Sequence, residues 1–424
     1  MSAAAGPSSH TAGKSAKRQA RSGVFLRAAG REAAWLRRHP RELAMISWVP
    51  LLAVLLLWWM FSAGIPTRLP IAIVDDDHSA LSRQLARMLE AAPGLRIARR
   101  DANLAEARAG MERGDIYAVV AIERDFSRDI KRGASGHVTL YHNAQFYTVS
   151  GLVLRDVQTV AMTLSVGVEM AARNRRGEPA QAVAVSAEPI RPSSLALFNP
   201  SLNYEQFLAA ALIPALLHIL GMTAGAWAVG REIRDRTVGA WLAAATGAGT
   251  APDGGVRIAA GPALAALAGK LAWPWTGLSG VGLAALLWLT WGRGWHPPGS
   301  LPWVALALVA FMALSIAMGA AAALATRSLR TALSLAGVVT APAFAFSGMG
   351  FPLAAMPVGA RAWALALPYT HYIRLQVEQL QMAAPLRQSL PAFVSMPVGT
   401  ALLALAGAWL LCRVAAEPAR WGGR

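Results

Sequence analysis

The chain contains one cysteine, Cys412, and few charged residues for its length. A single cysteine excludes an intrachain disulfide and a cysteine-ligated metal site within one chain. Charged residues make up 15% of the 424 residues, whereas hydrophobic residues make up 55%. This balance disfavours a soluble fold for the whole chain and is typical of a membrane protein.

The sequence also lacks the motifs of an enzyme. The nearest approach to a phosphate-binding loop is Gly269-Lys270, but no glycine stands five positions before Gly269, and neither Ser nor Thr follows the lysine. The eight histidines are scattered, and no nucleophile, base and orienting residue occur together. We therefore expect this chain to bind no ATP or other cofactor, to hold no metal and to contain no catalytic residue.

Acidic residues are scarce, with 23 Asp and Glu against 40 Lys and Arg. Basic residues gathered on a folded surface would suggest nucleic acid as a partner. Here nine of them precede the first long apolar run, opposed only by Glu32 and Glu42, and they are Lys14, Lys17, Arg18, Arg21, Arg27, Arg31, Arg37, Arg38 and Arg41. This positive-inside pattern predicts a basic cytoplasmic segment over residues 1–42, with the lipid bilayer and not nucleic acid as the partner.

Residues 43–65 read LAMISWVPLLAVLLLWWMFSAGI and contain no ionisable group. At ~1.5 Å per residue they are long enough to cross ~30 Å of hydrocarbon. A cleaved signal peptide is the rival interpretation, because small residues follow the apolar core. The long basic region and an apolar core that exceeds the usual ~7–15 residues favour an uncleaved first transmembrane helix.

Five further apolar segments complete a predicted set of six transmembrane helices, at 207–229, 271–291, 303–325, 331–351 and 391–411. They form a transmembrane domain over residues 207–412. Lys and Arg gather in the loop 230–257 and the tail 413–424, so both termini are expected in the cytoplasm. The third segment is the least regular, because Pro274 and nearby glycines favour a broken helix.

The same threading leaves residues 66–206 as one large extracytoplasmic domain. Its β-rich runs at 71–74, 95–98, 116–122 and 138–142 alternate with helical patterns at 79–92 and 104–114, which is typical of an α/β domain. A long helical pattern then runs from Tyr147 towards Arg173. Gly, Pro and Ser over 177–200 suggest an extended return to the membrane.

The acidic stretch Asp75-Asp76-Asp77-His78 stands between the first strand and the first helix of this domain. Oxygen ligands of this kind suit calcium or magnesium, although consecutive residues on an extended chain point in different directions. The alternative that we favour is helix capping, in which Asp77 or Ser79 accepts hydrogen bonds from the free backbone N–H groups.

Several segments in order resemble a known family. They are VDDDHSALSRQL (74–85), FNPSLNYEQFL (198–208), GREIRDRTVGAWLAAATG (230–247), AGKLAWPW (268–275), FSGMGFPLAAMP (346–357) and LPYTHYIRL (367–375). Together they resemble type 2 ABC transporter permeases, in the exporter subgroup with a large extracytoplasmic domain between the first and second helices. The resemblance runs from about residue 40 to residue 412.

The resemblance implies an α-helical polytopic membrane protein with an inserted α/β domain, acting as the permease subunit of an ATP-driven exporter in the bacterial inner membrane. It implies two permease copies or paralogues as a dimer, and separate cytoplasmic ABC ATPases that bind ATP and Mg. A hydrophobic or amphipathic cargo and a periplasmic adaptor are the candidate substrate and further partner. The alternative from another class is a membrane-anchored binding or scaffold protein without transport activity.

The loop 230–257 is where such an ATPase would bind. Its candidate contact residues combine charge pairs with a short helix at the membrane surface, and they are Arg231, Glu232, Arg234, Asp235, Arg236, Thr237, Gly239 and Trp241. An ordinary basic loop that obeys the positive-inside rule is the alternative. The family loop usually carries Glu followed closely by Gly-Thr, whereas this chain has Thr237-Val238-Gly239.

Two further groups of polar residues are candidates for the translocation path. His218 lies in the second apolar segment, where it would line the path, respond to pH or donate a hydrogen bond between helices. Prolines divide residues 352–385 into short outer re-entrant segments, and the resemblance makes Tyr369, His371 and Tyr372 outer-gate candidates, with anchoring in the interfacial aromatic belt as the alternative. Lys270 is interpreted as a residue that snorkels to the cytoplasmic surface.

Overall fold

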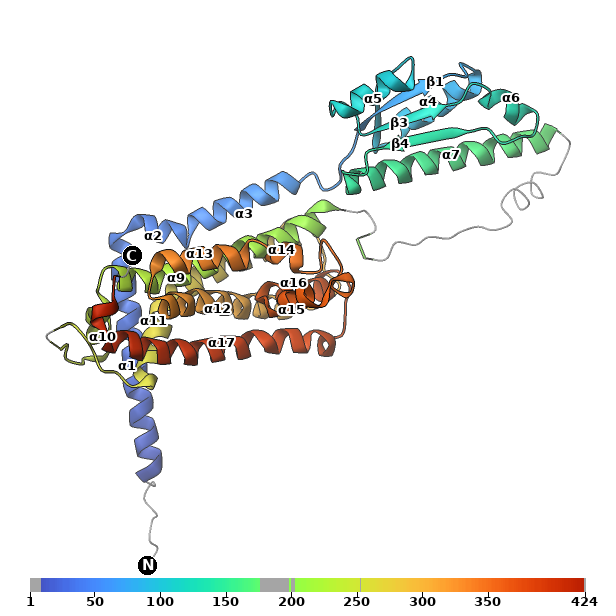
Figure 1. Cartoon of the computed structure of the whole chain (residues 1–424). Coiled ribbons are helices and arrows are strands. Elements are labelled where there is room, and N and C mark those ends of the chain that lie inside the picture. Colours follow the sequence, from blue (N-terminus) through green and yellow to red (C-terminus); the bar gives the residue numbers. More distant parts are fainter. Residues whose placement is uncertain (1–8, 176–197, 200–202, 252, 423–424) are drawn as a thin grey trace, which may run out of the picture. The chain divides into compact units, whose positions relative to one another are not determined.

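The computed structural model describes residues 9–175, 198–199, 203–251 and 253–422 (Figure 1). The chain divides into two compact units, which we describe separately. Unit 1 comprises Met1–Gly64 with Leu197–Arg424, and unit 2 comprises Ile65–Ala196. Most of the segment 177–200, for which we predict an extended return to the membrane, lies outside the described residues.

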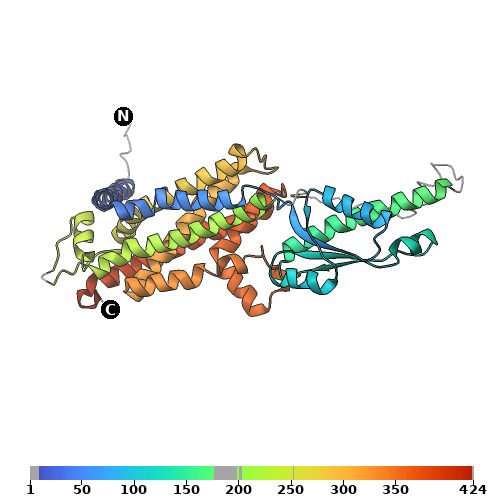
Figure 2. The same cartoon turned by 90° about the horizontal axis from the view of Figure 1, so that it is seen from above.

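In unit 1 most of the long helices run alongside one another, whereas α1 crosses them at one end, and short helices lie at both ends (Figure 1, Figure 2). Its elements are α1 (Ser9–Arg38), α2 (Pro40–Met45), α3 (Trp48–Phe61), the π-helix η1 (Glu205–Ala209), α9 (Ala210–Arg234), α10 (Val238–Thr246), α11 (Ala260–Leu287), the π-helix η2 (Trp288–Gly292), α12 (Leu301–Thr326), α13 (Leu329–Thr340), α14 (Ala343–Phe346), the 3₁₀ turn η3 (Leu353–Ala355), α15 (Val358–Ala366), α16 (Pro368–Leu380), α17 (Leu386–Ala416) and the 3₁₀ turn η4 (Pro418–Arg420). We call the end with α1, α10 and η4 the α1 end, and the end with α15 and α16 the α16 end.

Six stretches of unit 1 are long and apolar enough to cross a membrane. They are Pro40–Phe61, Glu205–Arg234, Ala260–Gly292, Leu301–Thr326, Leu329–Phe346 and Leu386–Ala416. Pro274 lies inside α11, which is continuous, so the predicted break in the third span is wrong. The reason is that α1, α12 and α17 pack along α11 and support the helix where the proline removes one hydrogen bond.

The closest helix contact in unit 1 joins α9 to α12. A Cβ atom at Gly225 would lie 2.0 Å from the carbonyl oxygen of Ile316, and one at Gly319 would lie 1.9 Å from that of Met222. Only glycine allows the two backbones to approach this far, as small residues do wherever membrane helices pack tightly. This contact builds the core of the bundle around Leu217, Phe311 and Met312.

Unit 2 is an α/β sheet domain, as predicted. Its elements are β1 (Leu69–Asp75), α4 (Ala80–Ala91), β2 (Leu95–Arg100), α5 (Leu104–Glu112), β3 (Ala118–Ile122), α6 (Phe126–Lys131), β4 (Val138–His142) and α7 (Tyr147–Arg175). The strand order is β2-β1-β3-β4, in which β1 is parallel to both neighbours and β4 is antiparallel to β3. The register places Ile73 opposite Val120 in the centre.

Helix α7 is a seventh stretch that is long and apolar enough to span a membrane, from Thr148 to Arg173. Its apolar face is used within unit 2, because Leu152, Val153, Val157 and Leu164 are buried in the core beneath the sheet with Leu85 and Leu89 of α4. The face of α7 that stays exposed is mostly polar and includes Arg155, Gln158, Thr159 and Thr163, which disfavours contact with lipid. We therefore assign the six stretches of unit 1, and not α7, to the membrane.

Side chains of the acidic stretch and of Ser79 form hydrogen bonds with nearby backbone N–H groups before and within α4. Ser79 is the N-cap, because its hydroxyl accepts from the N–H groups of Leu81 and Ser82, which confirms one of the two predicted caps. Asp75 accepts from the N–H groups of Asp77 and His78. Asp77 is not the cap.

Instead, Asp77 forms hydrogen bonds with the start of the neighbouring helix α6. Its carboxylate accepts from the N–H of Ser127 in the first turn of α6. Within the described residues, no group of three or more His, Cys, Asp or Glu is placed to hold a metal ion. The stretch therefore organises the junction of β1, α4 and α6 by hydrogen bonds.

Candidate functional site

Helix α1 packs against α10 and α11 at the α1 end of unit 1. Val24, Ala28, Glu32 and Leu36 are buried, and their four-residue spacing forms one stripe along the helix. The helices are in close contact, because a Cβ atom at Gly269 of α11 would lie 2.4 Å from the carbonyl oxygen of Phe25. The basic segment before the first span is thus a packed helix as well as a carrier of positive charge.

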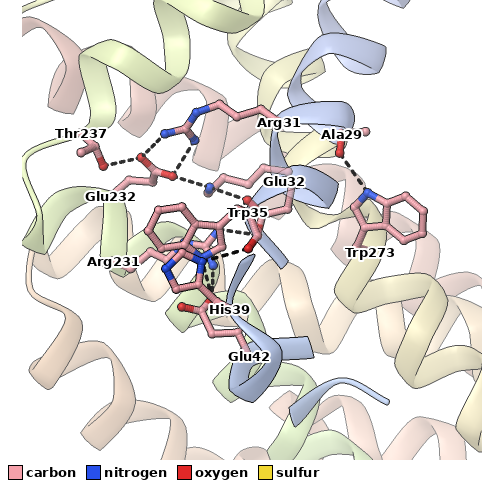
Figure 3. Close-up of polar contacts among 11 residues, drawn as sticks. Ala29, Arg31, Glu32, Trp35, His39, Glu42, Arg231, Glu232, Thr237 and Trp273 are labelled. Carbon is pink, nitrogen blue, oxygen red and sulfur yellow. Dashed lines mark hydrogen bonds and ion pairs between the residues drawn. The ribbon is translucent and has the colours of Figure 1, made fainter. Parts of the chain in front are cut away.

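The buried stripe brings a carboxylate into an ion-pair network with α9 and α11, which Figure 3 shows in part. Lys270 Nζ lies 2.9 Å from Glu32 Oε2 and 2.7 Å from Glu232 Oε1. Arg31 binds Glu232 through two hydrogen bonds of 2.7 and 3.1 Å. Arg231 pairs with Glu32. Side chains from three helices thus meet in one cluster.

Glu42 of α2 completes the network by pairing with Arg231. Three cations and three carboxylates then balance in charge, which is the condition for burying ion pairs without a large net penalty. We call the set Arg31, Glu32, Glu42, Arg231, Glu232 and Lys270 the ion network. Removing one partner would leave an uncompensated charge inside the protein.

Aromatic rings enclose the ion network. The Arg231 guanidinium lies 4.8 Å from the ring centre of Trp35, and Lys270 Nζ lies 4.8 Å from that of Trp241 in α10. Trp35 also donates a hydrogen bond of 3.0 Å to Glu42. Cation–π contacts of this kind strengthen where water is excluded. The contact between Trp241 and Lys270 connects the network to α10.

Lys270 requires a correction. Its side chain is fully buried and does not reach the surface, so the predicted snorkelling is wrong. The physical reason is that Glu32 and Glu232 supply the counter-charge inside the protein. Glu32 could have indicated this ion pair from the sequence, because it lies on the apolar stripe of α1, where a buried carboxylate needs a cationic partner.

The predicted loop residues fall into two groups. Arg231 and Glu232 belong to the last turns of α9, and Gly239 and Trp241 to the inner face of α10; all four are buried. Thr237 is half-buried and donates a hydrogen bond to Glu232. Buried side chains cannot form the outer surface of a docking site.

Arg234 ends α9, and Asp235 and Arg236 form the turn before α10; all three are exposed. Arg234 binds Asp235 through two hydrogen bonds of 2.7 and 3.0 Å. The N–H of Thr237 donates to the carbonyl of Glu232 at 2.8 Å, which closes the turn. Ala240 and Ala244 form the exposed side of α10. We call these five exposed residues the turn–α10 surface.

The C-terminal residues hold α10 from its other side. Trp421 is buried against Gly239 and Gly254, and its indole N–H donates to the carbonyl of Val414. Glu417 pairs with Arg327 at 2.7 Å, and this hydrogen bond keeps the pKa of the Glu417 carboxyl below its usual range. The turn–α10 surface is therefore backed by α1, α9, α11 and the C-terminal turn.

A family model described as "ABC-2 family transporter protein" matches residues 41–415, which is most of the chain. The chain belongs to the ABC-2 transporter family. It is a multi-pass permease subunit, a type of subunit that typically lacks ATPase activity and works with an ABC ATPase. No curated protein and no solved structure gives a match.

The family match confirms the predicted family, the helical membrane fold with an α/β insert, and the non-enzymatic role of this chain. It also decides between the two functional classes. The ABC-2 permease is a transporter subunit, and the scaffold hypothesis without transport is not supported.

In the permease, Tyr369 and Gln376 of α16 bind the first turn of α9. Pro214 has no N–H and leaves the carbonyl of Ala210 without its helical partner. Gln376 donates to that carbonyl at 2.7 Å, and the Tyr369 hydroxyl donates to the carbonyl of Ala211 at 2.8 Å. Side chains of α16 thereby satisfy backbone groups inside the membrane.

His218 and Tyr372 are also buried, on either side of Phe311. The ring centres of Phe311 and Tyr372 lie 4.7 Å apart in a stacked pair, and those of His218 and Phe311 lie 5.3 Å apart. Because the Ser315 hydroxyl donates to the carbonyl of Phe311, it accepts its 2.8 Å hydrogen bond from Nδ1–H of His218. This hydrogen bond joins α9 to α12, which is one of the roles predicted for this residue.

His371 stands apart from the other outer-gate candidates. Its Nε2 atom lies 2.8 Å from the carbonyl of Leu365, and the side chain is half-exposed. Roles of His218, Tyr369, His371 and Tyr372 in the translocation path stay predictions. In this structure the first two and Tyr372 are parts of the packed interior.

Proposed function

We propose that this permease exports a hydrophobic or amphipathic substrate across the bacterial inner membrane, driven by a separate cytoplasmic ABC ATPase that binds the turn–α10 surface. The observation that carries the proposal is the buried connection between that surface and the ion network. ATP and Mg belong to the partner in this account, and the permease functions as a dimer with a second copy or a paralogue.

The turn–α10 surface has the composition of a docking site. It presents two arginines and one aspartate in a fixed turn, followed by small residues that allow close approach. Charged groups at the rim of an interface steer and orient the partner. The buried members of the predicted set, Arg231, Glu232, Gly239 and Trp241, act by supporting this surface from within.

Three contacts connect α10 to the long helices, so a displacement of α10 would be passed to them. Trp241 contacts Lys270 of α11, and Thr237 binds Glu232 of α9. The carbonyl of Ala245 accepts a 2.8 Å hydrogen bond from Arg27 of α1. Because packed and charge-paired side chains resist deformation, α10 and these helices are expected to move together.

The orientation of the proposal rests on charge. Arginines of the turn between α9 and α10 share the α1 end with the basic residues of α1 and with Arg327, Arg330 and Arg413. The positive-inside rule favours this end for the cytoplasm. Unit 2, inserted between α3 and α9, is then extracytoplasmic and available to a periplasmic adaptor.

The cargo class is supported by the resemblance to exporters with a large external domain and by the apolar character of the spans.

Binding of the ATPase to the turn–α10 surface is the first part of the proposal to test, because the test needs no knowledge of the cargo. Tagged permease is purified from native membranes with Arg234 and Arg236 both replaced by Glu, and copurifying ABC ATPase is quantified by mass spectrometry.

We expect the double variant to lose most of the ATPase. The matched control is Arg37→Glu with Arg38→Glu, which reverses two exposed arginines of α1 outside the surface. Equal recovery of ATPase with both double variants would remove the turn–α10 surface from the proposal. Reversal of Glu232 is unsuitable for this test, because that residue is buried and its loss would disturb the ion network.

A further inference from the structure

A cavity of about 250 Å³ lies between α1, α11, α12 and α17. Its walls are apolar except for one hydroxyl, Thr400, and include Phe25, Leu271, Trp275, Ala317 and Ala404. An apolar cavity of ~150 Å³ is large enough to bind benzene. This one therefore has room for a longer piece of hydrocarbon.

The cavity opens sideways between the helices. Ala268 and Trp275 are exposed, and Phe25, Ala317 and Ala404 each keep part of their surface accessible. A lateral opening between membrane-spanning helices faces lipid chains and not water. The occupant therefore reaches the cavity from within the bilayer.

The depth of the cavity is set by the positions of its lining residues. On α11 they begin at Leu264, close to the start of the helix at Ala260. On α12 and α17, which run the opposite way, they reach Ala321 and Gly407, in the later half of each helix. The cavity thus belongs to the membrane leaflet next to the α1 end.

A cation stands at the end of the cavity that is nearest the surface. Arg21 lies one helical turn before Phe25, and its guanidinium is beside the start of α11, where a Cβ atom at Gly261 would lie 2.7 Å from Nη2. The side chain is exposed, and the described part of the chain gives it no ion-pair partner. An anionic group would complement this position.

We propose that the cavity binds one acyl chain of an anionic phospholipid from the leaflet next to the α1 end, with the phosphate at Arg21. The apolar walls select hydrocarbon, and the unpaired guanidinium selects negative charge at headgroup depth. A bound lipid would fill the space between α1 and the three spans, and so hold α1 in place. The lining residues of this site are separate from the turn–α10 surface.

The test is native mass spectrometry of the purified full-length permease, titrated separately with phosphatidylglycerol and phosphatidylcholine. We expect one retained phosphatidylglycerol, with a dissociation constant about fivefold lower than that of phosphatidylcholine, as ~1 kcal/mol from one arginine gives. Ala404→Phe fills the cavity and should abolish retention. Ala406→Phe, at an exposed position of the same helix, should not.

A separate variant tests whether Arg21 binds the lipid phosphate. Arg21→Gln should equalise the two lipids, whereas Arg38→Gln, at another exposed arginine of α1, should keep the preference. Equal phosphatidylglycerol binding by Ala404→Phe and Ala406→Phe would overturn the proposal. So would a loss of dimer, without a loss of lipid, in Ala404→Phe, because a second copy of the chain would then be the occupant.

A second measurement covers the case in which Ala404→Phe does not fold. Phosphatidylglycerol with brominated acyl chains quenches tryptophan fluorescence at contact, and Trp275 lines the cavity. Trp275→Phe should remove a share of the quenching that brominated phosphatidylglycerol produces at low lipid ratios. Equal quenching of the wild-type chain and Trp275→Phe would overturn the proposal.

Discussion

Lys270 is held by two carboxylates and an indole that come from three other helices, α1, α9 and α10. Its charge cannot be relieved by water, because the side chain is fully buried. Residues of this kind link distant parts of a chain: Glu32 and Lys270 are far apart in sequence and touch in the fold. At the residue scale, this set of ion pairs is what we propose to couple α10 to the long helices.

Replacing Lys270 by Met should destabilise the permease strongly. Glu32 and Glu232 would each lose a partner, and breaking a buried pair typically costs about 3–5 kcal/mol. Three carboxylates would then face two cations, so the second change Glu232→Gln removes the one excess negative charge and should recover part of the loss. Thermal unfolding of the purified single and double variants measures this coupling; strictly additive effects would show that the two side chains do not interact.

Tyr369→Phe should destabilise the permease modestly, by about 1 kcal/mol. The variant keeps the ring but loses the hydrogen bond to the carbonyl of Ala211 beside Pro214. Tyr372→Phe is the matched control, because the described residues give its hydroxyl no hydrogen bond. Thermal unfolding of both variants should separate them, and equal midpoints would remove the backbone-satisfying role of Tyr369.

At the scale of elements, α9 is the helix on which the others depend. It packs on α12 through Gly225 and Gly319, binds α16 at its first turn and carries Arg231 and Glu232 near its end. Hydropathy and the positive-inside rule could locate such a helix in the sequence. They could not show its contacts, which depend on glycine spacing and on partners far away in the chain.

Gly225→Ala should prevent α9 and α12 from approaching each other. The added Cβ would lie 2.0 Å from the carbonyl oxygen of Ile316, so the backbones must separate. Gly280→Ala is the matched control, because no atom lies within 4 Å of its Cβ position in α11. We expect a lowered unfolding temperature and a lower yield of monodisperse protein for Gly225→Ala only.

Local patterns in the sequence could predict some elements, whereas contacts between distant residues could not be predicted. Alternating strands and helices predicted the sheet of unit 2, and Ser79 before an amphipathic run predicted its cap. The ion network was missed because α1 was interpreted from its charge alone. The segment Arg21–Arg38 has five arginines, which indicate topology, and one glutamate on its apolar stripe, which indicates packing. Only the glutamate identifies the network.

At the scale of the whole permease, we propose that the turn–α10 surface is coupled to the membrane-spanning helices of unit 1. The turn–α10 surface would receive the ATPase, the ion network would transmit its movement to α9 and α11, and the α16 end would respond through side chains bound to the start of α9. Each link is a set of contacts within unit 1. The central claim is that the partner ATPase binds the turn–α10 surface.

Site-specific cross-linking tests this claim most directly. The chain has one cysteine, so Cys412→Ser provides a background in which Ala244→Cys labels the exposed side of α10, and Val358→Cys labels the exposed start of α15 as the control. A thiol-attached photoreactive probe is activated in native membranes, and the adducts are identified by mass spectrometry. The account predicts an ABC ATPase attached at position 244 and none at 358; an ATPase attached only at 358 would contradict it.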